Sequence, residues 1–516
     1  MSRINTNVSS VISQAHLGRN QRELDLRLER LSTGLRINRG ADDPAGLIIS
    51  ERIRSDINGV EQGIKNSDRA SSVISTTEAS LAEINDLLNS VRALIVESAN
   101  TGAVSQQERE ANQLQIDSAI ESITRISNTA SFGGLRLLDG TLDYRMSGIA
   151  ASAISVAQIR NASLLNAQSL QVTVDVLASA QKGALFLNGD NPGASPDGQL
   201  LSSMTLEIKG PKGVQEISFT SNTTLAQVAT AVNSIKQFTG VEAALLVAGQ
   251  PNSGMVFRTT EYGSENFVSV RRVSPPATGD SFSTFKLPDT TPVPASITWG
   301  SLVAAKLDAG RDVTALVNGS LAIGKGLDIT VNAASLGAYI RLSEDAGTRP
   351  AATPTSFYVT GGGALFQLGP DVTALQQSNF GIPSVAASRL GAASTANGVQ
   401  YLSSLKTGGR NSVEQAVQRG NDFNDSQDIL KNAIDEITEL RGRLGAFERN
   451  VLETNSRSLQ SQFENLTSSE SRIRDADFAQ ETSRLTRAQI LVSAGTSTLS
   501  LANQQSQQVL QLLQGG

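Results

Sequence analysis

Apolar residues recur at helical spacing at both ends of the chain. Within the first 39 residues, the four leucines Leu24, Leu28, Leu31 and Leu35 follow steps of four, three and four, the spacing of a coiled-coil seam. The last 29 residues, 488–516, also carry apolar side chains at roughly helical spacing. The larger ones are Ile490, Leu491, Leu499, Leu501, Val509, Leu510, Leu512 and Leu513. The pattern predicts a helix at each end.

The predicted C-terminal helix carries no charged side chain between residues 488 and 516. A solvated helix normally has charges on its outer face, and here Gln, Ser, Thr and Asn take their place. Two interpretations fit this helix alone. It docks on its own domain, or its polar face meets other protein molecules.

The N-terminal helix cannot be stable in isolation. Its large apolar side chains number about eleven, and each contributes roughly 2 kcal/mol when fully buried. Ordering the segment costs about 1 to 2 kcal/mol for each of some forty residues. The segment therefore requires packing partners.

Two further helices follow the N-terminal segment. Asp43 and Pro44 supply an N-cap and a proline at the first helical position, so a helix begins near Pro44 and its apolar period continues to about residue 99. A break at 98–102 precedes a third helix over 105–127. Helical periodicity returns at Ser412 and continues, apart from short breaks, to the C-terminus.

The middle of the chain has a different composition and predicts strands. Residues 172–409 are rich in Gly, Pro, Thr and Val. Alternation over 205–209 and 214–219 predicts a hairpin, a helix follows over 224–238, and strands near 241–247, 255–260 and 267–273 complete a ββαβββ module. Strands near 316–321, 327–331 and 338–342 indicate a second module. A short hairpin is also predicted from residues 136–138 and 144–146.

The predicted fold class is a multidomain α+β protein, with long coiled-coil-like helices from both chain termini and a β-rich central insertion. Three domains are expected. Residues 1–42 with 475–516 form an inner domain of terminal helices, and residues 43–171 with 410–474 form a helical domain with a β hairpin. Residues 172–409 form the insertion, as two modules at about 172–275 and 276–409.

Composition narrows the function. The formal net charge is -6, and no basic stripe is present to neutralise phosphates, so nucleic acid is not an expected partner. The chain has no Cys, which removes disulfides and thiolate sites and suits export of an unfolded chain. No window resembles a membrane span, and the first residues lack the apolar run of a signal peptide, so a secreted product needs another route.

Catalysis is not expected. The single histidine, His16, lies in the first predicted helix, so neither a zinc-binding histidine pair nor a Ser-His-Asp triad in the insertion can be assembled. No G-x-S-x-G or G-K-[ST] motif occurs, and the glycine triplet 361–363 is interpreted as a turn. No cofactor or metal is predicted.

Three separated segments, in order, resemble bacterial flagellin. They are LSTGLRINRGADDPAGLIISERI near the N-terminus, SFGGLRLLDG near residue 135, and SRLTRAQILVSAGTSTLSLANQQSQQVLQLL at the C-terminus. The resemblance implies a secreted filament subunit of the extracellular flagellum for swimming motility. In this family the terminal helices order only on assembly, around a channel through which unfolded subunits travel to the filament tip.

The resemblance also implies partners and a self-assembly surface. The expected partners are further copies of the chain, the flagellar export apparatus and its chaperone, the filament cap and the hook-junction proteins. The residues expected to carry self-assembly are Leu24, Leu28, Leu31, Leu35, Ile490, Leu491, Leu499, Val509, Leu512 and Leu513. Two alternatives are a hook-filament junction protein and a filament subunit whose outer domains form an adhesive or binding surface.

The resemblance implies a binding patch for a host immune receptor, but this sequence matches it only in part. Some members of this family are sensed by a host innate immune receptor through the long helix of the second domain, and Arg92 and Leu94 match the usual pattern there. Ser90 replaces a basic residue, and Gln115 stands where a receptor-contacting glutamate is expected. Leu94 is equally well interpreted as a packing residue.

Overall fold

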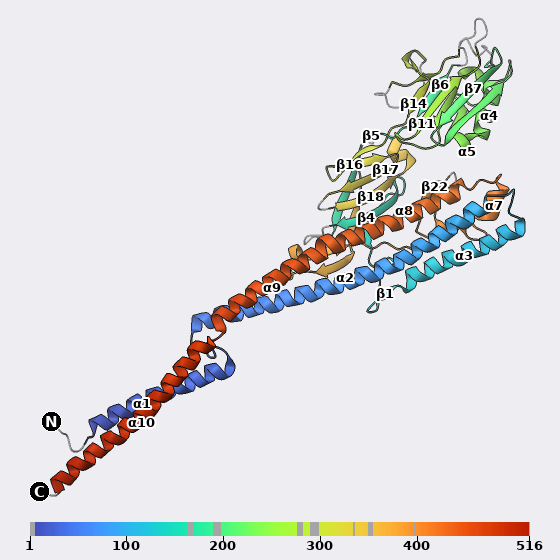
Figure 1. The fold of residues 1–516 in the computed structure, drawn as a ribbon. Helices are drawn as coiled ribbons and strands as arrows, with labels where there is room; N and C mark the ends of the chain where they lie inside the picture. The colour runs from blue at the N-terminus through green and yellow to red at the C-terminus, as the bar shows by residue number, and fades with distance from the viewer. Residues whose placement is uncertain are drawn as a thin grey trace. The chain divides into compact units, whose positions relative to one another are not determined.

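The computed structural model describes residues 6–162, 169–188, 198–275, 282–288, 299–333, 336–348, 354–395 and 398–514. Contacts within the chain are concentrated in two units, each described by itself. Unit 1 contains Met1–Ser71, Phe366–Gln377 and Phe447–Gly516, and unit 2 contains Ser72–Leu365 and Ser378–Ala446. Long terminal helices with a β-rich central region confirm the predicted fold class (Figure 1).

Unit 1 is built from helices of both chain ends. They are α1 (Val8–Thr33), the first half of α2 (Pro44–Ser98), α9 (Glu453–Arg474) and α10 (Phe478–Gln514). The predicted start of α2 is confirmed, because the Asp43 carboxylate accepts the backbone N–H of Gly46 at 2.9 Å. A π-helical turn, η5 (Glu448–Leu452), joins α8 (Asn424–Phe447) to α9.

One short segment of the insertion also belongs to unit 1. Phe366–Gln377 packs on α2 and α9, where the Asn455 amide donates to the Leu368 carbonyl at 2.8 Å. A Cβ on Gly59 would lie 2.9 Å from the Pro370 side chain. The small residue on α2 thus lets this segment approach the helix closely.

Helices also form one part of unit 2. α3 (Gln106–Thr129) begins with a capping box in which Ser105 and Glu108 satisfy each other's backbone N–H groups. Its apolar stripe, Ile116, Ile120 and Ile123, is fully buried. The second half of α2 and the helix α8 bury matching stripes, which include Leu81, Ile84, Leu88, Ile437, Leu440 and Leu444.

The predicted hairpin between residues 136–138 and 144–146 does not form, so this prediction is wrong. The hairpin in the structure joins β1 (Ser131–Phe132) to β2 (Leu135–Arg136). Gly133 and Gly134, between these strands, have φ angles of +58° and +86°, which a tight turn needs. The following Leu137 and Leu138 are both fully buried, so they do not alternate as strand residues do.

The strand at 144–147 instead belongs to a large antiparallel sheet of eight strands. Their order is β3-β19-β5-β15-β16-β17-β18-β4. The strands are β3 (Tyr144–Ser147), β4 (Ile154–Ala162), β5 (Leu170–Ala178), β15 (Thr314–Val317), β16 (Ser320–Lys325), β17 (Asp328–Asn332), β18 (Leu336–Leu342) and β19 (Thr355–Gly362). One face of this sheet forms a core of Val, Ile, Leu, Ala and Phe side chains.

A second core lies within the central module. The predicted ββαβββ order is confirmed by β7 (Met204–Gly210), β8 (Gly213–Phe219), α4 (Leu225–Ser234), β9 (Val241–Leu245), β10 (Met255–Thr259) and β11 (Phe267–Arg272). The short helix α5 (Lys236–Thr239) follows α4. β7 and β8 form the predicted hairpin around residues 210–213.

Strands on both sides of residue 275, the predicted end of the first module, pair with each other. β6 (Ala184–Leu187) and β10 share a sheet with β12 (Phe285–Lys286) and β13 (Val303–Ala304), and β11 pairs with β14 (Leu307–Ala309). Residues up to 309 therefore complete the first module. The chain passes between the module and the eight-stranded sheet at Gln181 and Arg311, which pair with each other in an isolated bridge.

Candidate self-assembly surface

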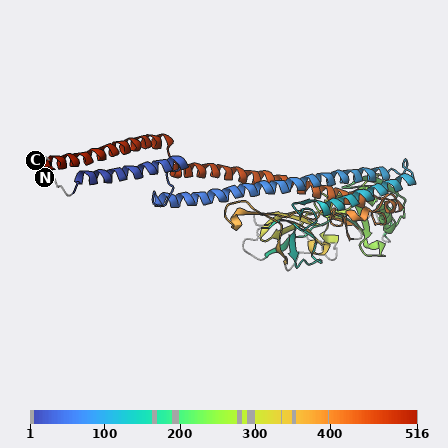
Figure 2. The same cartoon turned by 90° about the horizontal axis from the view of Figure 1, so that it is seen from below.

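The helices α1 and α10 form an antiparallel pair and lie side by side in both views (Figures 1 and 2). The Asn7 amide donates to the Ala502 carbonyl at 3.0 Å, and the Asn20 amide donates to the Leu491 carbonyl at 3.3 Å. Between these points, a Cβ on Gly495 would lie 3.8 Å from the Leu17 Cβ. The pair is held together along most of its length.

The seam of this pair follows heptads on both helices. On α1 two series with a spacing of seven are buried or half-buried: Ser10, Leu17, Leu24 and Leu31, and Ser13, Asn20 and Arg27. Gly18, Leu26, Glu29 and Arg30 beside them are also half-buried. On α10 they are Glu481, Ala488, Gly495 and Ala502, together with Leu485, Val492 and Leu499. Three of the four positions in the first α10 series are Ala or Gly, and such small residues allow the helices to approach closely.

The residues predicted to carry self-assembly divide between this seam and the outer surface. Leu24, Leu31, Leu35 and Leu499 are half-buried. Leu28, Ile490 and Leu491 are 48%, 63% and 42% exposed. The side chains of Val509, Leu512 and Leu513 lie outside the described residues.

Several exposed apolar residues of unit 1 were not among those predicted to carry self-assembly. They are Val8, Val11, Ile12, Ile48, Ile49, Phe478 and Leu501. Each is visible in the sequence as an apolar residue. For those on α1 and α10, the pairing of the two helices decides which face stays exposed, whereas Ile48 and Ile49 lie on α2. Exposed apolar area of this extent is typical of a protein-binding surface.

A buried ion cluster lies where the C-terminal part of α1 meets the first turn of α10. Glu481, in the first turn of α10, is 3% exposed and contacts Arg27 at 3.0 Å, Arg30 at 3.6 Å and Arg484 at 3.4 Å. Partial burial lowers the pKa of Arg27, but hydrogen bonds to Glu481 and Glu23 outweigh it and raise that pKa overall. Both α1 and α10 thus contribute charges to one site.

Next to this cluster the two chain segments are joined by backbone hydrogen bonds. α1 ends at Gly34, whose φ of +72° is the left-handed conformation of a helix C-cap. The Arg36 N–H donates to the Arg474 carbonyl at 2.7 Å, and the Ala476 N–H donates to the Gly34 carbonyl at 2.9 Å. The N-terminal segment and the α9–α10 break are therefore fixed to each other.

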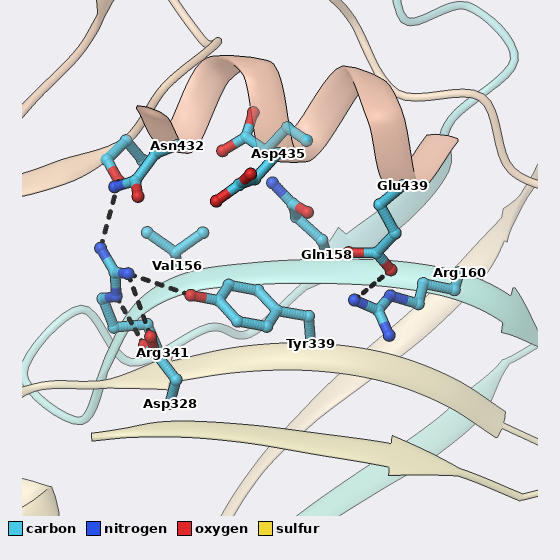
Figure 3. Close-up of a pocket in the computed structure, with 11 residues that line it drawn as sticks. Val156, Gln158, Arg160, Asp328, Tyr339, Arg341, Asn432, Asp435 and Glu439 are labelled. Carbon is cyan, nitrogen blue, oxygen red and sulfur yellow. Dashed lines mark hydrogen bonds and ion pairs between the residues drawn. The ribbon is translucent and has the colours of Figure 1, made fainter. Parts of the chain in front are cut away.

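Unit 2 contains a polar cavity of about 170 Å³ between α8 and the outer face of β17, β18 and β4 (Figure 3). Arg341 binds both carboxylate oxygens of Asp328, at 2.6 and 3.1 Å, and Arg160 pairs with Glu439. Burial raises the pKa of Glu436, which also lines the cavity, to about 7, although the Gly391 and Ala392 N–H groups lower it. Both arginines that line the cavity, Arg341 and Arg160, are thus paired with carboxylates of the protein itself.

The remaining predicted residues are placed as follows. Arg92 is exposed on α2 and Leu94 is half-buried. His16 is on α1, and its Nδ1 lies 2.6 Å from an Arg19 guanidinium nitrogen. Within the described ranges, no group of three or more His, Cys, Asp or Glu residues is arranged to hold a metal ion, and no helix is long and apolar enough to cross a membrane.

The fold and this surface define an α+β protein whose paired terminal helices expose an apolar face and flank a β-rich insertion. Family models match the same parts of the chain. The bacterial flagellin N-terminal helical region matches residues 4–143, the bacterial flagellin C-terminal helical region matches residues 427–513, and the flagellin hook IN motif matches residues 205–261.

Relatives match over the whole length. A flagellin of Salmonella choleraesuis is 30% identical over 528 residues, covering 99% of each chain. The B-type flagellin of Pseudomonas aeruginosa is 28% identical and a flagellin of Escherichia coli is 29% identical, each with 99% of both chains covered. The chain belongs to the flagellin family and is a subunit of the bacterial flagellar filament. Full-length similarity to flagellins does not favour the alternative of a hook-filament junction protein.

Proposed function

We propose that the chain polymerises through the exposed apolar faces of α1 and α10, with residues 1–42 and 475–516 as the inner assembly domain. The observation that carries this proposal is the set of large apolar side chains, such as Ile490, that the helix pair leaves open to solvent. Burying such a side chain against a neighbouring copy contributes about 1.5 to 3 kcal/mol. The same contacts repeat in every subunit, so the polymer gains from each of them.

A pair of matched substitutions tests this assignment. Ile490→Asp places a charge on the proposed contact face of α10, where burial of an unpaired carboxylate is costly, so we expect loss of polymerisation. Ile323→Asp makes the same change at an isoleucine of β16 that is 74% exposed, and normal filaments are expected. Sedimentation and electron microscopy of the two purified variants give the result, and normal filaments from Ile490→Asp would contradict the proposal.

We propose further that the chain is exported unfolded through the flagellar apparatus with a chaperone and assembles outside the cell beneath the filament cap, beyond the hook-junction proteins. The uncharged C-terminal half of α10 supports this view. Neutral amides and hydroxyls would line a channel without attracting a passing chain by charge. We expect several lysines introduced on this face to impair export or assembly, measured as flagellin in the culture medium.

The protein is proposed to act as a structural subunit and not as an enzyme, in keeping with its family. For host recognition, an innate immune receptor is proposed to contact α2 at Arg92, whose side chain is exposed. Leu94 is less accessible, because it is half-buried. Binding of receptor ectodomain to the Arg92→Ala variant, compared with the unmodified subunit, tests this proposal.

A further inference from the structure

The seam between α1 and α10 leaves their register weakly specified by packing. The α10 positions that face α1 after Glu481 form two series spaced by seven residues. Ala488, Gly495 and Ala502 are small, and Leu485, Val492 and Leu499 are aliphatic. Displacement of α10 by one heptad would replace each residue with another of similar size and polarity. Apolar contacts alone therefore discriminate little between the native register and its neighbours.

Polar contacts supply the missing discrimination. Backbone hydrogen bonds between residues 34–36 and 474–476 hold one end of the pair, and the ion cluster next to them is a charged contact that depends on the register. In the native register Glu481 contacts Arg27 and Arg30. After a displacement of one heptad, the α1 residue in place of Arg27 would be Asn20 or Gly34. The buried carboxylate would then lose its main cationic partner, which is strongly unfavourable.

The geometry of the cluster argues against a mainly stabilising role. The Nε atoms of Arg27 and Arg30 are buried, and neither has a hydrogen-bond partner among the described residues. Desolvation of incompletely satisfied charges offsets much of the attraction within such a cluster. A single buried polar group that costs stability and fixes register is well known in coiled coils.

We infer that Glu481, next to the backbone hydrogen bonds of residues 34–36 with 474–476, is the side chain that sets the register of α10 against α1 when the terminal helices order in the filament. The inference rests on the proposed polymerisation through α1 and α10. Glu481 acts as a positioning residue, and its removal should allow α10 to occupy registers displaced by seven residues. Filaments would then contain subunits of more than one internal length.

Cysteine pairs can report the register directly, because the chain has no cysteine of its own. Leu17→Cys with Gly495→Cys reports the native register, since the two Cβ positions are 3.8 Å apart and suit a disulfide. Leu17→Cys combined with Ala488→Cys or with Ala502→Cys reports the two displaced registers. Each double variant is polymerised as a minor component with unmodified subunits, so that disulfides form almost only within one chain.

Oxidation followed by non-reducing electrophoresis gives the yield of each disulfide. With Glu481 present, the native pair should form and the displaced pairs should stay at background. With Glu481→Gln, we expect the displaced pairs to increase about tenfold, which corresponds to about 1.4 kcal/mol. Glu23→Gln is the matched control, because it removes the exposed acidic partner of Arg27 and should leave the pattern unchanged.

The outcomes separate the two proposals. A native-only pattern with Glu481→Gln, in filaments that form normally, overturns the inference and leaves the polymerisation proposal intact. Failure of unmodified subunits to polymerise overturns the proposed function itself. If Glu481→Gln subunits are not incorporated, the charge exchange Glu481→Arg with Arg27→Glu is tested. Restored incorporation with the native disulfide supports the inference, and no restoration contradicts it.

Discussion

At the scale of single residues, burial gives chemically similar groups different roles. Glu481 and Glu436 are both carboxylates on helices, yet the first contacts three arginines and the second accepts backbone N–H groups inside a cavity. A formal charge count from the sequence treats them alike. The surroundings of Glu436 raise the pKa of its carboxyl group to about 7, near neutral pH.

Glu436 should make the stability of unit 2 dependent on pH. Burial raises its pKa from 4.5 in the unfolded chain to about 7 in the folded protein. Between these values the folded protein keeps a proton that the unfolded chain has lost, so stability falls as the pH rises through this window. The full effect is on the order of 3 kcal/mol.

Hydrogen exchange of α8 amides at pH 5.5 and pH 8, corrected for intrinsic exchange rates, measures this effect. Glu436→Gln should remove most of the difference in opening free energy between the two pH values. Asp435→Asn changes the adjacent, exposed carboxylate in the same cavity and serves as the control. An unchanged pH dependence with Glu436→Gln would refute the assignment.

At the scale of elements, glycine marks the ends and the interiors of helices in different ways. Gly34 ends α1 in the left-handed conformation, whereas Gly18 lies inside the same helix. A Cβ at either position would meet no atom within 4 Å. The two sites therefore differ in backbone conformation and not in available space.

Alanine should act in opposite directions at these two glycines. Gly34→Ala places a Cβ on a left-handed residue and should destabilise the α1–α10 pair by about 1 kcal/mol. Gly18→Ala should stabilise α1 by about 0.5 to 1 kcal/mol, because alanine has the higher helix propensity. The midpoint of thermal depolymerisation is the measurement, and equal shifts in one direction for both variants would exclude this explanation.

At the scale of the whole molecule, the two cores of unit 2 are separable. The central module has a core of its own, with residues from Leu185 to Val270, and it is bounded by chain segments that lie side by side. A Cβ on Gly183 would lie 3.2 Å from the backbone nitrogen of Gly310. If the module were deleted, the two chain ends left at this point could therefore be joined with little distortion of the remaining structure.

Deletion of residues 183–309, with a short glycine linker, should leave filament formation intact. Deletion of the whole predicted insertion, 172–409, should not. It removes β5 and β15–β19, which cover the core side chains of β4, and it removes Phe366–Gln377, which packs on α2 and α9. Electron microscopy of filaments from both variants is the measurement, and loss of filaments from the shorter deletion would contradict the separation of the cores.

The sequence by itself determined the helical ends, the start of α2 at Pro44, the ββαβββ order and the family. These features depend on local periodicity, capping residues and motifs, which neighbouring residues in the chain carry. The tertiary structure alone decided that residues 144–147 pair with β19 and that Leu28 lies off the seam while Leu24 faces it. It also decided that Glu481 meets Arg27, 454 positions away. Pairings between distant segments depend on which faces the folded chain brings together, and a one-dimensional pattern does not contain that information.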